Sequence, residues 1–191
     1  MSKSLYLFLI ITHLIANPFD AWVDQNKNVL NKTIKSVSFQ IRLAARLDSK
    51  EEKILNGQIV VGGKNQFRYE MGPRTVISDG TIWKSYDERT DQVFIQKPDK
   101  KLEKALFAWT KVKKLKAIRV KNKPDGSCKI KLFGKKNDIQ AYFNSDTNVL
   151  DSILISTRNG FESKIFNISI ESADSVSLTI GTESTTFFDL R

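Results

Sequence analysis

The chain has 191 residues, 40% of them hydrophobic, and its 31 Lys and Arg against 21 Asp and Glu give a net charge of +10. Its one histidine, His13, lies in an N-terminal apolar segment, and its one cysteine, Cys128, can form no internal disulfide. The composition excludes a disulfide scaffold. Once that segment is removed, it also excludes a histidine-based triad, general base or metal site.

The N-terminal segment has the pattern of a secretory signal. Lys3 supplies a positive charge, and residues 5–16 (LYLFLIITHLIA) form an apolar run that is too short for a membrane anchor. We expect residues 1–16 to be removed after Ala16, and residues 17–191 to form a single domain. No cysteine follows the signal directly, so the exported protein should carry no lipid anchor and should be soluble.

A helix and then a strand are predicted after the signal. Apolar residues recur at helical spacing over residues 20–36, and the period then changes to strict alternation of apolar and polar residues. This alternation predicts a strand with one apolar face, whose positions are Val37, Phe39, Ile41 and Leu43. Residues 55–61 predict the next strand.

Residues 66–93 (QFRYEMGPRTVISDGTIWKSYDERTDQV) predict two successive β-hairpins. Apolar and charged residues alternate over residues 67–71, and Gly72-Pro73 ends that strand. Residues 75–78 lead into Asp79-Gly80, the strongest short hairpin signal, and the return strand is expected to begin at Thr81. A sheet meander is the local prediction.

The second half of the chain predicts one helix and a series of strands. Pro98-Asp99 opens a helix over residues 100–109, with Leu102, Leu106 and Trp109 on one face. Turn residues then separate predicted strands at residues 117–121, 129–133, 139–143, 151–157, 162–170, 176–180 and 185–190. Cys128 begins an alternating run and is expected to be a small core residue.

These elements predict a mostly β, α+β fold. About ten or eleven antiparallel strands joined by short turns suggest a strongly curved sheet, or an incomplete, unclosed β-barrel. Two helices cannot cover both faces of such a sheet. The economical arrangement places them as a lid across the concave face, where apolar residues of the helices and strands meet or enclose a space.

Residues 66–93 also resemble the periplasmic outer-membrane lipoprotein carriers of the LolA family. The resemblance rests on an ordered series, namely Phe67, Tyr69, Pro73, Ile77-Ser78-Asp79-Gly80, Trp83, Tyr86-Asp87 and Gln92-Val93. The family spaces its Trp and Tyr two residues apart, whereas Trp83 and Tyr86 are three residues apart, so we expect a bulge. The resemblance implies a monomeric protein of the Gram-negative periplasm that ferries lipoproteins from the inner to the outer membrane.

The same resemblance implies a hydrophobic cavity for acyl chains beneath the helical lid. Its expected wall and lid residues are Phe39, Ile41, Leu43, Phe67, Tyr69, Met71, Trp83, Leu102, Leu106 and Trp109. From the residues alone, the strand members fit a filled core equally well. An Arg that holds the lid closed in the family is replaced here by Gly63, with Lys64 beside it, and we therefore expect a looser lid.

The positive charge is concentrated in one segment. Residues 97–136 carry 15 Lys or Arg against 3 Asp or Glu, whereas residues 137–191 carry 3 against 8. Lys111, Lys113, Lys114 and Lys116 directly follow the predicted lid helix and are candidates for docking an acidic partner or anionic head groups. A solvated basic face is the alternative. Nucleic acid is a poor partner for an exported protein with few aromatic residues in this segment.

Catalysis finds little support in the sequence. The chain has no G-x-S-x-G elbow, P-loop or metal-spaced Cys and His set, and acidic neighbours such as Asp87-Glu88 are typical of solvated surface. No enzyme activity and no cofactor or metal is expected. The partners implied by the resemblance are acylated lipoprotein N-termini, an inner-membrane ABC lipoprotein-releasing complex, and an outer-membrane receptor or the membrane itself. Alternatives are a lipid or lipoprotein sensor on the same fold and a basic envelope scaffold without a ligand.

Overall fold

The structure is a computed structural model that describes residues 18–43, 53–99, 117–122, 127–132, 138–144, 146–156 and 162–191. Side chains are described in these ranges except at residues 43, 117–139, 155–156 and 162. The predicted lid helix at residues 100–109, the lysines from Lys111 to Lys116 and the predicted signal at residues 1–16 lie outside the described residues. The side chain of Cys128 does so too.

The described chain forms one mostly β structure. Its helices and strands are α1 (Pro18–Gln25), α2 (Lys27–Leu30), β1 (Lys35–Leu43), β2 (Lys53–Val61), the 3₁₀ turn η1 (Gly63–Asn65), β3 (Phe67–Met71), β4 (Arg74–Ser78), β5 (Trp83–Asp87), β6 (Gln92–Gln96), β7 (Ala117–Asn122), β8 (Ser127–Leu132), β9 (Asp138–Asn144), β10 (Leu150–Ser156), β11 (Glu162–Ser172) and β12 (Thr186–Asp189). All twelve strands belong to one sheet, in the order β12-β6-β5-β4-β3-β2-β1-β11-β10-β9-β8-β7.

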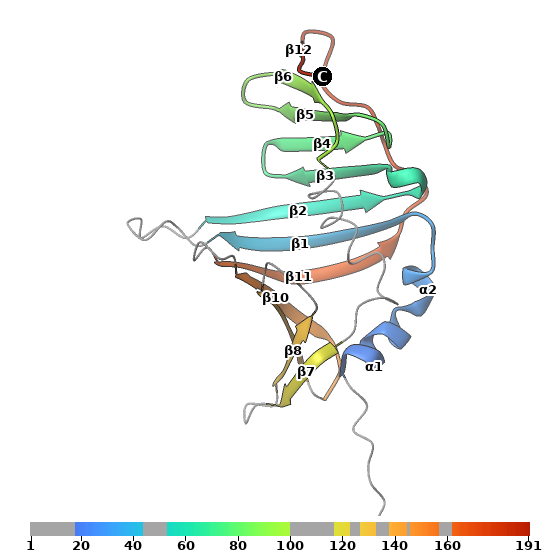
Figure 1. Cartoon of the computed structure of the whole chain (residues 1–191), viewed down its shortest axis with the longest axis vertical. Coiled ribbons are helices and arrows are strands. Elements are labelled where there is room, and N and C mark those ends of the chain that lie inside the picture. The colour runs from blue at the N-terminus through green and yellow to red at the C-terminus, as the bar shows by residue number, and fades with distance from the viewer. Residues whose placement is uncertain are drawn as a thin grey trace, which may run out of the picture.

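The sheet is curved and unclosed, as predicted. Figure 1 shows β7 and β8 turned well away from the direction of β1 and β2, while β6 and β12 lie at the opposite end. Twist between neighbouring strands accumulates in this way in open sheets. Within the described ranges, the sheet therefore ends on two edge strands, β12 and β7.

The C-terminal segment departs from the prediction in two ways. Residues 176–180 form no strand, and β12 pairs with β6 in parallel, whereas the other neighbouring strands are antiparallel. The segment passes Gly62, accepts a hydrogen bond of 2.7 Å from Arg68 Nη1 at the carbonyl of Thr179, and reaches Asp91. It crosses the sheet from the end of β2 to the start of β6, so its backbone cannot join a ladder.

Apolar and polar residues alternate over residues 176–180, but the cause is not pairing within the sheet, as a predicted strand would require. Val176, Leu178 and Ile180 are half-buried and the residues between them are exposed. Ile77 and Val93, only 3% and 0% exposed, point to the sheet face that the segment crosses. A period of two therefore reflects one side of an extended segment packed on a sheet, not a sheet strand.

The N-terminal helix is shorter than predicted. It breaks at Asn26, and its second part ends at Leu30 instead of residue 36. Asn26 Nδ2 donates to the carbonyl of Trp22 at 2.9 Å, and Asn is a poor residue for a helix interior because its side chain competes for backbone groups. Lys35 Nζ donates to the carbonyls of Leu30 and Lys32, which closes the helix end and starts β1.

The turn between β4 and β5 explains the Asp79-Gly80 motif. Asp79 Oδ1 accepts hydrogen bonds from the backbone N–H groups of Thr81 and Ile82, so the loop has four residues and β5 starts at Trp83 instead of Thr81. Gly80 has φ +98°, a conformation that favours glycine. The predicted bulge is absent, because β5 pairs with β4 without a register shift.

Gly80→Ala should destabilise the protein by about 1–3 kcal/mol, because it adds a Cβ at positive φ. That Cβ would also overlap the carbonyl oxygen of Lys64 in η1. Gly63→Ala is the matched control, since its Cβ would meet only Thr33 Cγ2 at 3.8 Å. Urea unfolding of both variants checks this, and equal midpoints would contradict the role given to Gly80.

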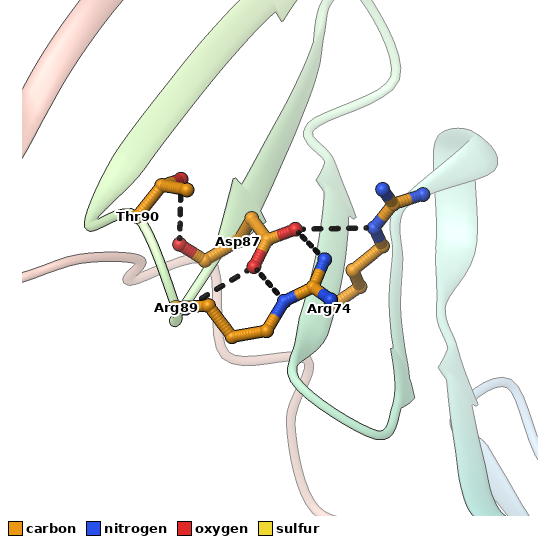
Figure 2. Close-up of polar contacts among 4 residues, drawn as sticks. All are labelled: Arg74, Asp87, Arg89 and Thr90. Carbon is orange, nitrogen blue, oxygen red and sulfur yellow. Dashed lines mark hydrogen bonds and ion pairs between the residues drawn. The ribbon is translucent and has the colours of Figure 1, made fainter.

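A charged cluster ties the end of β5 to its neighbours. Asp87 accepts hydrogen bonds from Arg89 Nε at 2.9 Å and Nη2 at 2.6 Å, and from Arg74 Nε at 3.3 Å on β4 (Figure 2). These partners, Arg89 first, hold the pKa of Asp87 well below its ordinary value of 3.8. The sequence context suggested that Asp87 is a solvated surface residue. In the structure it instead connects the β5–β6 hairpin to β4.

Asp87→Asn should lower the melting temperature at pH 7. It should also make the melting temperature fall less steeply as the pH is lowered. The depressed pKa means that the carboxylate stabilises the fold above pH 3.8, and that this contribution is lost as the pH falls below that value. The variant and the original protein should therefore converge in acid. Glu88→Gln, which changes the exposed neighbouring residue, is the control. Parallel melting curves down to pH 2 would contradict this account.

Candidate ligand-binding face

The pairing register places a continuous set of apolar side chains on one face of the sheet. Val37 pairs with Ile59, Ile59 with Tyr69, and Tyr69 with Val76. Paired residues project to the same side, and Val76 is followed across the sheet by Ser85 and Phe94. We call this side the apolar face. Phe39, Met71 and Ile41 lie on it by alternation along their strands.

A filled core occupies one part of the apolar face. Val37, Ile59, Val61, Phe67 and Trp83 form a buried cluster. Phe67 is 0% and Trp83 2% exposed, and their rings meet edge to face with centroids 5.4 Å apart. Both residues were expected on a cavity wall, and the structure places them within this core.

Trp83 keeps one unsatisfied group in that core. Its indole Nε1 is buried and, within the described part of the chain, has no hydrogen-bond partner. An unpaired buried donor of this kind costs about 1–3 kcal/mol. The packing at this position is therefore not optimised for stability alone.

A half-buried border surrounds the filled core. Phe39, Tyr69 and Val76 pack against the cluster but keep part of their surface accessible. Met71, which lies on the same face of β3 as Tyr69, is half-buried too and completes this border. Tyr69 donates its hydroxyl to Met71 Sδ at 3.0 Å, and burial raises the pKa of this phenol. The border is thus apolar enough to disfavour a charge while remaining reachable from outside the core.

Gly57 makes the position of Phe39 possible. A Cβ on Gly57 would lie 2.5 Å from the Phe39 ring, which therefore lies directly against the β2 backbone opposite it. Glycine inside a strand often marks such a close approach. The contact joins residues 18 positions apart in the sequence.

The two helices cover a different part of the same face. Phe19 and Trp22 of α1 pack against Phe143 of β9, with ring centroids 6.4 Å apart in both cases. Leu30 of α2 packs against the same cluster. Lys35 is 6% exposed beside it, and desolvation lowers the pKa of its amine. In the described chain, α1 and α2 therefore stabilise the region of β9 to β11. They are not part of the cluster that Tyr69 and Val76 contact.

A groove of about 830 Å³ is lined mainly by side chains of the opposite face of the sheet. Ser38, Gln40, Asn56, Gln58 and Glu70 line it, and strand alternation places all of them opposite Phe39 and Tyr69. Its amides pair with one another: Gln40 Nε2 donates to Asn56 Oδ1, and Asn167 Nδ2 donates to Gln40 Oε1. Phe39, Leu55 and Met71 also contribute to its lining, so the groove has a mixed polar and apolar character.

The predicted site residues divide into three groups. Phe39, Ile41, Tyr69 and Met71 are half-buried on the apolar face, and Phe67 and Trp83 are in its core. The side chains of Leu43, Leu102, Leu106 and Trp109 and of the four lysines are outside the described residues. Sequence reasoning missed Val76 and Phe94, although both alternate in register with Tyr69 across the hairpins.

Other features of the described chain are plain. No group of three or more His, Cys, Asp or Glu in these ranges is placed to hold a metal ion. Over the same residues, no helix has the length and apolar character needed to cross a membrane.

Comparisons with known proteins give matches among solved structures. No protein-family model and no curated protein sequence matches the chain. An uncharacterised conserved protein from Thermus thermophilus matches with a TM-score of 0.50 and 11% identity, over 89% of this chain and 98% of that one.

Solved structures from the expected family are also among the matches. A LolA superfamily protein from Nitrosomonas europaea has a TM-score of 0.40 at 12% identity, over 78% and 94% of the two chains. An outer membrane lipoprotein-sorting protein domain from Vibrio parahaemolyticus has a TM-score of 0.39 at 5% identity, over 82% and 92%. The predicted fold class, a mostly β and unclosed curved sheet, is confirmed by the structure itself.

Proposed function

We propose that residues 17–191 are a soluble periplasmic carrier, exported by a signal at residues 1–16, which binds the acyl chains of lipoproteins and moves them from the inner to the outer membrane. The observation that carries the proposal is the half-buried apolar border at Phe39, Tyr69, Met71 and Val76. It lies on one face of an unclosed curved sheet, beside a core that is already filled.

The physical need for such a surface follows from the hydrophobic effect. Each methylene hidden from water contributes about 0.8 kcal/mol, so an acylated protein crosses an aqueous space very slowly unless its chains are covered. Transfer from a bilayer to an apolar protein surface is nearly neutral in free energy. The carrier then requires an energised loading complex at the inner membrane and a better acceptor at the outer one.

The basic segment is the proposed docking site for these membrane partners. Lys111, Lys113, Lys114 and Lys116 contribute to the excess charge of residues 97–136, which follow β6 directly. A concentration of positive charge favours acidic protein surfaces and anionic head groups, and it raises association rates.

Met71→Glu should leave a folded protein with greatly weakened lipopeptide binding. A carboxylate on an acyl-binding surface must lose water without gaining a partner. Asn56→Glu places the same charge on an exposed position of the neighbouring strand, on the opposite face, and should bind normally. Melting by circular dichroism and fluorescence polarisation with a labelled diacylated peptide measure stability and affinity.

Two outcomes would count against this site. A stable Met71→Glu variant with unchanged affinity would exclude the border as the acyl surface, and equal losses in both variants would point to a general charge effect. Phe67→Glu calibrates the assay, because Phe67 is completely buried and its replacement should unfold the domain.

Reversing the four lysines to Glu should slow transfer between membranes without changing acyl binding or the melting temperature. Steering by charge weakens as the Debye length falls from about 10 Å at 0.1 M salt to about 3 Å at 1 M. Transfer by the original protein should therefore slow with added salt, and transfer by the variant should not. Transfer rates that are equal for both proteins and independent of salt would mean that the segment is only a solvated basic face.

A further inference from the structure

The edge strand β12 and the residue after it carry exposed apolar side chains that have no role in the proposed carrier function. Phe187 is 51%, Phe188 39% and Leu190 63% exposed. Natural sheets commonly protect their edges with charge, proline or covering segments, because an open edge pairs readily with another chain. An edge strand with two consecutive phenylalanines therefore needs a partner or an explanation.

The ladder shows which backbone groups of β12 are available. The N–H of Thr186 donates to the carbonyl of Asp91, and the N–H of Leu190 donates to the carbonyl of Ile95. In a parallel pair, alternate residues of a strand bond to the same neighbour. The N–H and C=O groups of Phe187 and Asp189 therefore point away from β6, toward the open edge of the described sheet.

The apolar face continues to this edge. Phe188 stacks on Phe94 of β6, with ring centroids 5.2 Å apart and planes at 17°. Phe94 belongs to the same row across the sheet as Val76, Tyr69 and Ile59. From Tyr69 this row runs through Val76, Ser85 and Phe94 to Phe188, so it links the border to the outward-facing backbone groups of β12 in the described sheet.

We propose that β12 binds the extended polypeptide that follows the acylated residue of the cargo, as an added strand at the sheet edge. This inference rests on the proposed carrier function. Four residues are too short an edge for a stable pair of free proteins, since such interfaces bury about 1,200 Å² or more. A tail tethered by its bound acyl chains needs no such area, because the tether raises its effective concentration to about the millimolar range.

The geometry sets the length of tail required. From β4 to a strand added beyond β12 there are four strand spacings of about 4.8 Å, or about 19 Å. About six extended residues span that distance. About three more residues are needed to pair with Phe187 and Asp189, so tails of about nine residues should engage the edge and tails of about four should not.

The test measures the affinity of synthetic diacylated peptides whose tails have two to twelve residues. Affinity should rise about tenfold between the short and the long tails, as expected for two to four added hydrogen bonds. Phe187→Pro removes an N–H that faces away from β6, so it should keep the fold and abolish the gain. Phe187→Ala keeps that N–H and should retain most of the gain.

Each result decides between stated alternatives. Equal affinity at all tail lengths, or a gain that survives Phe187→Pro, overturns the edge inference while leaving acyl binding intact. If no diacylated peptide binds, the proposed function fails and the edge inference fails with it. N-methylation of alternate tail residues tests the pairing without any protein variant. A concentration-dependent dimer that Phe187→Pro abolishes would assign the edge to a second copy.

Discussion

The structure depends on the register that aligns apolar side chains across β1 to β6. Because each pair from Val37 to Val76 is directly opposed, a one-residue slip in any strand would send its apolar side chains to the polar side. Along the strands, the Phe67–Trp83 contact lies on one side of this row and the Asp87 cluster on the other. Between them lies the half-buried border on which the proposed function depends.

The two faces of the sheet are treated differently by the rest of the chain. The C-terminal segment crosses one face and is anchored there by Asp91, which accepts hydrogen bonds from Ser184 and Thr185 at 3.0 and 2.6 Å. The apolar face receives α1 and α2 only near β9 to β11. Stability is thus supplied by the filled core of the apolar face, by the segment on the opposite face and by α1 and α2 at one end. Phe39 and Tyr69 therefore need not be fully covered for the fold to form.

The hairpins could be predicted because their turns are determined by neighbouring residues. Elements that depend on contacts between distant residues could not be predicted in the same way. Gly72-Pro73 and Asp79-Gly80 act within a few residues, so the strands they separate follow from the sequence. The end of α2 depends on Lys35 reaching back to two carbonyls, and residues 176–180 depend on a sheet face formed by distant strands. Neither arrangement leaves a periodic signal of its own.

The candidate site, too, could be predicted from the sequence only in part. Alternation correctly placed Phe39, Tyr69 and Met71 on one face, but it does not distinguish their half-burial from the complete burial of Phe67. That difference comes from Trp83, which follows Phe67 across the sheet only after two turns. Likewise, the free groups of β12 follow from its parallel pairing with β6, which a sequence of short strands does not indicate.

The most direct test of the account is to identify what the protein carries. The full chain would be expressed with its signal, purified from the periplasm without detergent, extracted into organic solvent and analysed by mass spectrometry. The account predicts acylated peptides or intact lipoproteins in the original protein and their loss in Met71→Glu, with Asn56→Glu unaffected. Free lipid alone would indicate a lipid sensor, and the absence of any bound acyl group would contradict the central claim.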